Sequence, residues 1–456
     1  MLFLQKITLL KQNKIYRSVG VLVGGTAFSQ LLMVLALPLL TRLYTPEDFS
    51  ILAVYTAILT IISTAACLRF DIAIPLPKQD NTAIQLLILA LIFSLTTSLI
   101  IAIPILYNPL AIAALLNQPL IAPYLFLIPM GVFLASSYSA LQFWATRNKN
   151  FKLITKTRIS QVILGVGTQL TLGWFGLQSL GLILGQILIS GAGIVSLSRY
   201  SRKNIAWEKY KLDLNSLKNT FKEFEKFPKI STFETLANNA AIQVPLILIA
   251  AIAVSAEAGF LMLAMRAMQV PMSLIGNATA QVYLSKASEE FREGQLPSFT
   301  HKILLSLIKV GIAPLLFFCM CAPLIFSIVF GKEWGRAGEL VSWMAPWFII
   351  QLITSPISMV MYVRSRQASM LMLTLAGLAI RVGAVSFSAV LMPDYLSEIY
   401  ALTGAIFYAV CFIVFSRAAD LKSAHYLSIF KTLGICLILG TVAAVIAKTL
   451  LFPLLS

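Results

Sequence analysis

Long apolar runs recur along almost the whole chain and constrain its fold more than any other feature. Each run has about the 20 residues that a helix needs to cross the hydrocarbon core of a bilayer. With 59% hydrophobic and only 12% charged residues, the sequence fits a polytopic membrane protein and no soluble domain. We therefore expect an all-α membrane protein whose spans are residues 19–40, 50–68, 83–106, 120–142, 159–177, 179–198, 231–254, 258–283, 303–330, 339–363, 368–391, 396–416 and 432–451.

The distribution of positive charge predicts the orientation of these spans. Placing the N-terminus in the cytoplasm puts 28 of the 35 Lys and Arg residues in cytoplasmic gaps and four in outer gaps, and leaves Arg266, Lys309 and Arg381 inside spans. Lys and Arg are enriched in cytoplasmic loops of membrane proteins. The formal net charge of +17 is therefore mostly a topology signal, and we expect no nucleic-acid partner.

One long polar stretch, Arg199–Lys229, divides the spans into two sets. Both sets then start on the cytoplasmic side, as in transporters built from two repeats related by a pseudo-two-fold axis along the membrane normal. We expect a six-helix bundle at 1–198, a linker at 199–230, a second six-helix bundle at 231–416, and a further linker with an extra C-terminal helix at 417–456.

Within the linker, apolar and basic residues fall on different faces of a predicted helix. Leu217, Phe221, Phe224 and Phe227 share one face, and lysines share another. This pattern is typical of a short helix that lies on the membrane surface. The alternative is a solvated linker.

The span at 258–283 carries an arginine near its middle, Arg266. A central Arg costs about 2.5–3.5 kcal/mol on insertion scales, so it requires a polar environment. In a helix it shares one polar face with other side chains at spacings of three or four residues, namely Gln269, Ser273, Asn277 and Gln281. We expect Arg266, Gln269, Asn277 and Gln281 to line a wet substrate cavity.

Four more polar residues inside spans are candidates for the same cavity. Arg381 lies at membrane depth, although a structural contact to a carbonyl or a buried acid is the alternative for both arginines. Gln30 and Gln161 either line the cavity or bridge helices by hydrogen bonds, and Gln169 has the same two alternatives.

Two segments predict the starts of helices. Thr45-Pro46-Glu47-Asp48 combines an N-cap, a first-turn proline and acidic residues favoured by the helix dipole. Ser231 and Glu234 fit a capping box that starts the seventh span. Alternatively, Glu234 and Asn238, one helical turn apart, face the cavity and bind a coupling ion.

Arg69 and Asp71, at the cytoplasmic end of the second span, could hold a lipid headgroup. The alternatives are a local ion pair or a charge that simply follows the positive-inside rule. Elsewhere the residues offer little for enzymatic chemistry: the five cysteines lie in apolar runs and are expected to be free, and both histidines fall in predicted loops. We expect no catalytic residue, no metal site and no cofactor.

Several segments, taken in order, form a recognisable pattern. The first two are residues 38–49 (PLLTRLYTPEDF) and 68–78 (LRFDIAIPLPK). The later ones are Phe227-Pro228, the segment 266–288, residues 330–334 (FGKEW), Ala345-Pro346, 355–358 and Arg366-Gln367. In this order they resemble bacterial polysaccharide biosynthesis proteins, the oligosaccharide flippases of the multidrug/oligosaccharidyl-lipid/polysaccharide exporter superfamily, and the first two resemble the opening of that family.

The resemblance implies 12–14 transmembrane helices and a function as a flippase in the bacterial inner membrane. The implied cargo is an oligosaccharide repeat unit linked to undecaprenyl diphosphate, moved to the periplasmic leaflet by alternating access for surface polysaccharide or O-antigen assembly. The implied partners are membrane lipids and, in the same pathway, a polysaccharide polymerase and glycosyltransferases. Thirteen runs depart from the usual even number, so the last run is either peripheral or re-entrant, or one span is misplaced.

Two other functions are compatible with these residues. The first is a drug/cation antiporter of the same superfamily, although a cationic cargo would favour buried carboxylates over buried arginines. The second is a membrane polysaccharide polymerase or ligase, which would need a sizeable outer loop with acid/base residues, and the outer gaps are short.

Overall fold

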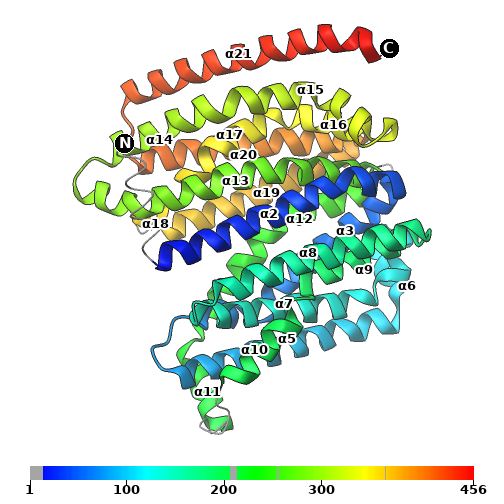
Figure 1. Cartoon of the computed structure of the whole chain (residues 1–456), viewed down its shortest axis with the longest axis vertical. Coiled ribbons are helices and arrows are strands. Elements are labelled where there is room, and N and C mark those ends of the chain that lie inside the picture. Colours follow the sequence, from blue (N-terminus) through cyan, green and yellow to red (C-terminus); the bar gives the residue numbers. More distant parts are fainter. Residues whose placement is uncertain (1–13, 206–212, 254–255, 365, 456) are drawn as a thin grey trace. The chain divides into compact units, whose positions relative to one another are not determined.

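The computed structural model describes residues 14–205, 213–253, 256–364 and 366–455. It does not describe the side chains of residues 14–23 and 451–455, or those of several residues elsewhere, most of them between 270 and 288. Helices dominate the described chain (Figure 1). By its internal packing the chain divides into two units, Met1–Gln243 and Val244–Ser456. The domain limits expected from the sequence stay a prediction.

The first unit contains the helices up to and including the first half of α12. They are α2 (Lys14–Leu43), α3 (Pro46–Ala66), α4 (Phe70–Ala73), α5 (Asp80–Tyr107), α6 (Pro109–Leu115), η1 (Pro119–Tyr124), α7 (Leu127–Arg147), α8 (Phe151–Trp174), α9 (Gln178–Gly191), α10 (Ile194–Asn204), α11 (Leu214–Glu223), η3 (Phe227–Ser231) and α12 (Thr232–Ile252).

The second unit contains the remaining helices. They are α13 (Glu257–Arg292), α14 (Leu296–Leu307), η4 (Ile308–Ile312), α15 (Ala313–Val329), η5 (Lys332–Trp334), α16 (Gly335–Trp343), α17 (Ala345–Ile357), α18 (Val360–Val363), α19 (Gln367–Leu391), η6 (Pro393–Tyr395), α20 (Leu396–Ala418) and α21 (Ser423–Leu455).

Each predicted span lies mostly in helices, although the spans at 120–142 and 339–363 contain short turns. Nine helices there are long and apolar enough to cross a membrane, or ten if α16 and α17, which meet at an angle of 52°, form one broken span. The other three predicted spans fall on α7, α8 and α13, which lie outside this set. The fold is an all-α, multi-pass membrane fold, as the sequence predicts.

The second span starts as its sequence predicts. The Thr45 side chain accepts a hydrogen bond from the backbone N–H of Asp48, and the Asp48 carboxylate accepts one from the backbone N–H of Thr45. This reciprocal capping box satisfies two backbone donors that a helix start leaves open. The second oxygen of Asp48 accepts from Ser179 Oγ at 2.5 Å, which connects the start of α3 to α9.

The second predicted capping box, at Ser231, is not formed. The backbone is already helical from Phe227, because the π-helical turn η3 leads directly into α12. Ser231 is therefore inside a helical segment, where its backbone N–H is no longer an open donor that a capping side chain would satisfy. Glu234 does lie in the first turn of α12.

The linker helix is present as α11, but its apolar face packs against protein. Leu217, Phe221, Phe224 and Phe227 all contact the hydrophobic core formed by α4, α5 and α7, and the Phe221 ring lies 5.4 Å from the Phe70 ring. Thr220, which is buried, donates a hydrogen bond of 2.5 Å to Gln85 of α5. The apolar face of α11 is therefore docked within the first unit, and a position of this helix at the membrane surface stays a prediction.

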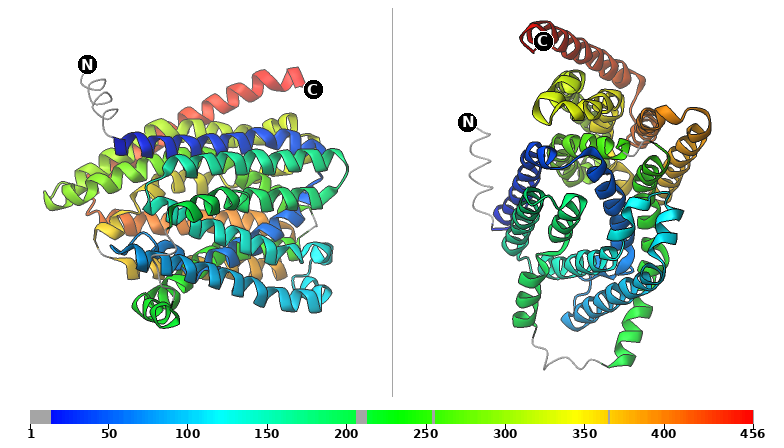
Figure 2. Two further views of the ribbon diagram at one scale, coloured as in Figure 1. Left: turned by 60° about the horizontal axis from the view of Figure 1, so that its bottom comes forward. Right: turned by 90° about the vertical axis from the view of Figure 1, so that its right-hand side faces the viewer.

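The surplus C-terminal run is one continuous helix of 33 residues, α21. At 1.5 Å per residue its length is about 50 Å, enough to cross a bilayer. It packs along α15 and also contacts α14 and η4 within the second unit, and it is drawn in red in Figures 1 and 2. A re-entrant segment, one of the predicted alternatives, is therefore excluded.

Candidate functional site

In the first unit, the most unusual backbone lies between α3 and α4. Leu68 and Arg69 both adopt positive φ angles, 49° and 60°, a conformation that costs about 1 kcal/mol or more for residues other than glycine. This turn carries the two residues that the sequence selects as a possible headgroup site, Arg69 and Asp71.

The carboxylate of Asp71 is buried beneath the turn. Its residue is only 4% exposed, and its Oδ2 accepts a hydrogen bond of 2.7 Å from Ser139 Oγ on α7. Asp71 Oδ1 and the Nε of Arg69 have no hydrogen-bond partner. No ion pair joins Arg69 to Asp71, so the predicted local ion pair is wrong. Both residues retain unused hydrogen-bonding capacity at one end of the unit.

A layer of hydroxyl groups lies next to this turn between α5 and α7. Ser94 Oγ lies 2.6 Å from Ser136 Oγ and 3.0 Å from Ser137 Oγ. The free thiol of Cys67 contacts the carbonyl oxygen of Ser136 at 3.4 Å. Small hydroxyl side chains allow helices to approach closely and to hydrogen-bond across the contact, so this layer fixes the turn relative to α7.

The glutamines of the first unit have different surroundings. Gln169 bridges two helices, because its Nε2 donates to the Leu182 carbonyl of α9 at 3.1 Å. Gln161 is 4% exposed and its Nε2 has no partner. Gln30 on α2 is half-buried and makes a polar or ring contact. Gln169 is therefore a helix bridge, and cavity roles for Gln30 and Gln161 stay predictions.

On α12, the contact with α3 is made by Asn239, the residue that follows the candidate site residue Asn238. Glu234 and Asn238 are exposed, whereas Asn239 donates to Thr64 Oγ1 of α3 at 3.0 Å. Asn239 could have been found as the next polar residue of the same helix, but the sequence does not show which of two adjacent asparagines faces a neighbour. The coupling-ion role of Glu234 and Asn238 stays a prediction.

In the second unit, Arg266 lies on the long helix α13, which continues through Pro271 without a break. Arg266 is half-buried and makes a polar or ring contact, and Gln269 is exposed. The side chains of Asn277 and Gln281 are outside the described ones. The polar stripe on α13 is therefore described only in its first half.

Arg381 on α19 is enclosed by aromatic rings. It is 3% exposed, and its guanidinium carbon lies 4.5 Å from the ring centre of Phe407, 5.4 Å from Trp347 and 5.9 Å from Tyr408. Cation–π contacts of this kind are worth about 2 kcal/mol when they are desolvated. These ring contacts are neither of the two structural contacts expected from the sequence, a carbonyl or a buried acid, and a cavity role for Arg381 stays a prediction.

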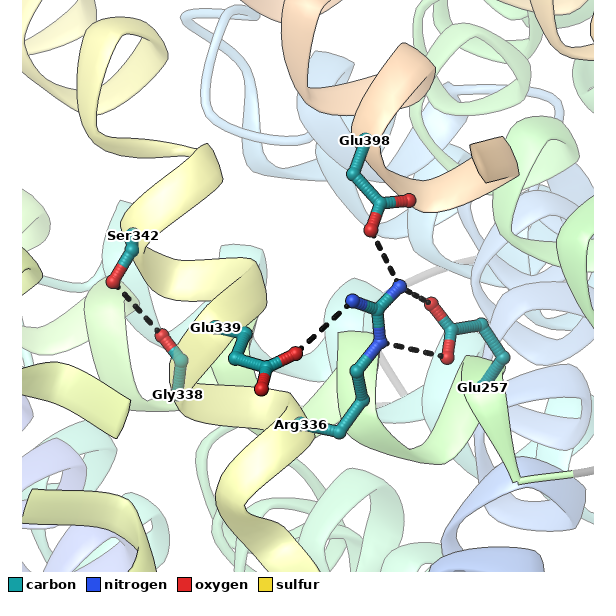
Figure 3. Close-up of polar contacts among 6 residues, drawn as sticks. All are labelled: Glu257, Arg336, Gly338, Glu339, Ser342 and Glu398. Atoms are coloured by element: carbon teal, nitrogen blue, oxygen red, sulfur yellow. Dashed lines mark hydrogen bonds and ion pairs between the residues drawn. The ribbon is translucent and has the colours of Figure 1, made fainter. Parts of the chain in front are cut away.

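The largest ion cluster of the second unit was not predicted (Figure 3). Arg336 on α16 binds Glu257 through Nε and Nη2 at 3.4 and 3.0 Å, Glu398 at 2.6 Å and Glu339 at 3.2 Å. Glu257 and Glu398 lie in the first turns of α13 and α20, where the helix dipole favours negative charge. Arg336 thereby holds the starts of two helices against α16.

The cluster has three carboxylates for one guanidinium, but it is not arranged as a metal site. Among the described residues, no group of three or more His, Cys, Asp or Glu side chains could hold a metal ion. The signal that could have pointed to the cluster is the position of Glu257 and Glu398 at predicted helix starts. Their common partner is separated from each of them by more than 60 residues and is visible only in the folded unit.

The fold is that of exporters of the MOP superfamily. It is similar to the lipid II flippase MurJ in its inward closed conformation, with a TM-score of 0.67 and 12% identity over 95% of this chain and 99% of that chain. It is also similar to an inward-facing multidrug resistance MATE family transporter of the MOP superfamily, with a TM-score of 0.57 and 14% identity over 88% and 93% of the two chains.

At the sequence level, the chain belongs to the polysaccharide biosynthesis protein family, because the model of that family matches residues 39–339. This is well over half of the 456 residues. No curated protein sequence matches the chain. The family resemblance seen in the sequence is confirmed, and the protein is a multi-pass membrane protein with the fold of transporters.

Proposed function

We propose that the protein is a flippase that moves an oligosaccharide repeat unit linked to undecaprenyl diphosphate from the cytoplasmic to the periplasmic leaflet of a bacterial inner membrane. Membership of the polysaccharide biosynthesis family is the observation that carries the proposal. The transported unit would feed surface polysaccharide or O-antigen assembly, together with a polymerase and glycosyltransferases. The N-terminus lies in the cytoplasm in this proposal, and transport proceeds by alternating access.

A diphosphate headgroup requires positive partners inside the membrane, and arginine is suited to this role because its planar fork of donors matches phosphate oxygens. Arg266 is the first candidate, since it is half-buried within a long helix. Arg69 is the second, with an unused donor at the end of the first unit. In this proposal they screen the diphosphate, and the lipid tail stays in the bilayer.

The alternative, a drug/cation antiporter, would need carboxylates available to a cationic cargo. In the second unit, Glu257 and Glu398 are both occupied by Arg336. A polymerase or ligase would need acid/base residues in a large outer loop, and among the described residues the connections between the long helices are short or helical. The helical connections favour a transporter over a polymerase. The buried Asp71 of the first unit keeps one carboxylate oxygen without a partner, so drug susceptibility is the measurement that separates the antiporter from the flippase.

Deletion of the gene tests the proposal directly. We expect loss of one surface polysaccharide and accumulation of its lipid-linked repeat unit in the cytoplasmic leaflet. Normal polysaccharide with a normal leaflet distribution would overturn the proposal. A changed susceptibility to cationic drugs with unchanged polysaccharide would instead support the antiporter.

Complementation of the deletion then tests the role of Arg266. We expect Arg266→Ala to reduce translocation at unchanged protein level. The matched control is Arg292→Ala, which removes an exposed arginine at the last turn of the same helix and should complement fully. Equal complementation by both variants would exclude Arg266 from the substrate path.

A further inference from the structure

Arg158 is a half-buried residue of α8 and lies one residue before the span 159–177 that the sequence predicts. The helix starts earlier than its apolar run, because the Asn150 side chain accepts the N–H of Leu153 and caps it. Arg158 is therefore the eighth helical residue, about 10 Å from the start of the helix. It follows the buried Ile154 by four residues and precedes the buried Gln161 by three, so all three share one face.

The partners of this arginine are neutral. Arg158 Nη1 donates to Thr26 Oγ1 of α2 at 2.6 Å, and its guanidinium lies beside the Tyr138 hydroxyl of α7. Tyr138 in turn lies 3.1 Å from Thr157 Oγ1. Hydroxyl groups orient a guanidinium but do not neutralise its charge.

Among the described residues, no carboxylate forms an ion pair with Arg158. Three other largely buried arginines do have such a partner, whereas the buried Arg381 contacts aromatic rings instead. Arg147 pairs with Asp80, Arg364 with Asp420, and Arg336 with three glutamates. None of the ion pairs among the described residues includes Arg158. A charge that is partly withdrawn from water is destabilised unless a counter-charge is near. The half-buried Arg158 therefore favours an anion at this place.

A second observation points to a ligand on the same face. Gln161, one turn deeper, is 4% exposed, and its Nε2 donor has no partner. A buried donor without a partner is unfavourable, because its hydrogen bond to water is lost and not replaced. Arg158 and Gln161 thus offer a guanidinium and an amide N–H within one helical turn, which suits a ligand with several negatively charged oxygen atoms.

We propose that Arg158 and Gln161 form an anion site inside the first unit that binds a phosphoryl group. The inference deepens the proposed function, because the diphosphate of a lipid-linked sugar would be the natural ligand of this site. A free phosphate compound has the same chemistry and is the other source. Thr26 and Tyr138 are positioning residues that hold the guanidinium.

Binding of inorganic pyrophosphate to the purified full-length protein in detergent tests the site. We expect pyrophosphate to raise the unfolding temperature of the wild type, measured by intrinsic fluorescence, at a constant ionic strength set with chloride. Arg158→Gln should weaken the apparent affinity at least tenfold. The apparent affinity of Arg158→Lys for pyrophosphate should lie between those of the wild type and Arg158→Gln, since lysine keeps the charge but not the planar arrangement of donors.

Lys156→Gln is the matched control, because Lys156 is an exposed cation on the same helix. It should bind pyrophosphate like the wild type. If Arg158→Gln does not fold, Gln161→Leu carries the test, because it removes only the amide donor and should also weaken binding. Equal stabilisation of the wild type, Arg158→Gln and Gln161→Leu, or no stabilisation of the wild type by any phosphate compound, would overturn the site.

Two further ligands separate the sources of the phosphoryl group. Undecaprenyl diphosphate in mixed micelles should stabilise the wild type at lower concentration than pyrophosphate if the lipid carrier is the ligand, whereas phosphatidylglycerol should have no effect that depends on Arg158. If pyrophosphate binds and undecaprenyl diphosphate stabilises the wild type at no lower concentration, the result supports a free phosphate compound as the ligand. Arg158-dependent binding combined with normal polysaccharide in the gene deletion would uphold the site and overturn only the transport proposal.

Discussion

Replacing Arg336 by alanine should destabilise the second unit strongly. The change leaves Glu257 and Glu398 without their cation, although their side chains are only 16% and 8% exposed. Removing one partner of a fully buried ion pair costs about 3–5 kcal/mol, and a hydrogen bond to a charged group contributes about 1.5–3 kcal/mol. Because the Arg336 side chain is 28% exposed, solvent screens part of this energy, and we expect a loss of about 3 kcal/mol.

The loss can be measured as a change in the free energy of unfolding in mixed micelles with increasing SDS. Glu339→Gln is the internal control, since the Glu339 side chain is 56% exposed and exposed pairs contribute about 0–1 kcal/mol. A double-mutant cycle of Arg336→Ala with Glu398→Gln should give a coupling energy above about 1 kcal/mol. If Arg336→Ala costs no more than Glu339→Gln, burial does not strengthen this cluster and the reasoning fails.

Two more variants test the packing of the first unit. Gly165→Ala should cost about 1–3 kcal/mol in the free energy of unfolding, because a Cβ at Gly165 would lie 2.6 Å from the Gly185 carbonyl oxygen of α9. Its control is Gly167→Ala, where a Cβ would meet nothing within 4 Å, so this change should be neutral or slightly stabilising. Equal losses of stability in the two variants would contradict the close approach of α8 and α9. Phe221→Ala should increase amide hydrogen exchange along α11, because it removes the ring contact with α4. Lys222→Ala changes an exposed residue of the same helix and should leave exchange unchanged. If α11 stays as protected from exchange in Phe221→Ala as in the wild type, docking of α11 through this ring is refuted.

The helices were predictable because a membrane leaves the backbone few choices. Any apolar run at membrane depth must satisfy its own hydrogen bonds, and a helix does so within the run. Local capping chemistry was also predictable where the signal is complete, as at Thr45 and Asp48. The start of α8 was placed too late, since the apolar run begins at Ile159 whereas the cap lies at Asn150.

Contacts between distant parts of the sequence were not predictable. The periodicity of α11 shows that one face is buried but does not show whether lipid or protein covers it. Similarly, hydropathy does not predict the partners of buried arginines. Arg336 contacts three carboxylates, whereas Arg381 contacts three aromatic rings. The fate of each buried charge depends on tertiary partners, and this is why the candidate site was only partly visible in the sequence.

The positive φ angle of Arg69 has a consequence for how this position can vary. Glycine adopts this conformation at no steric cost, so a glycine after Leu68 would remove the strain from the folded backbone. An arginine at this point retains strain of about 1 kcal/mol or more and keeps a long cationic side chain available. Arg69→Gly would therefore relieve the backbone strain and at the same time remove the positive charge that the proposed headgroup role of Arg69 needs.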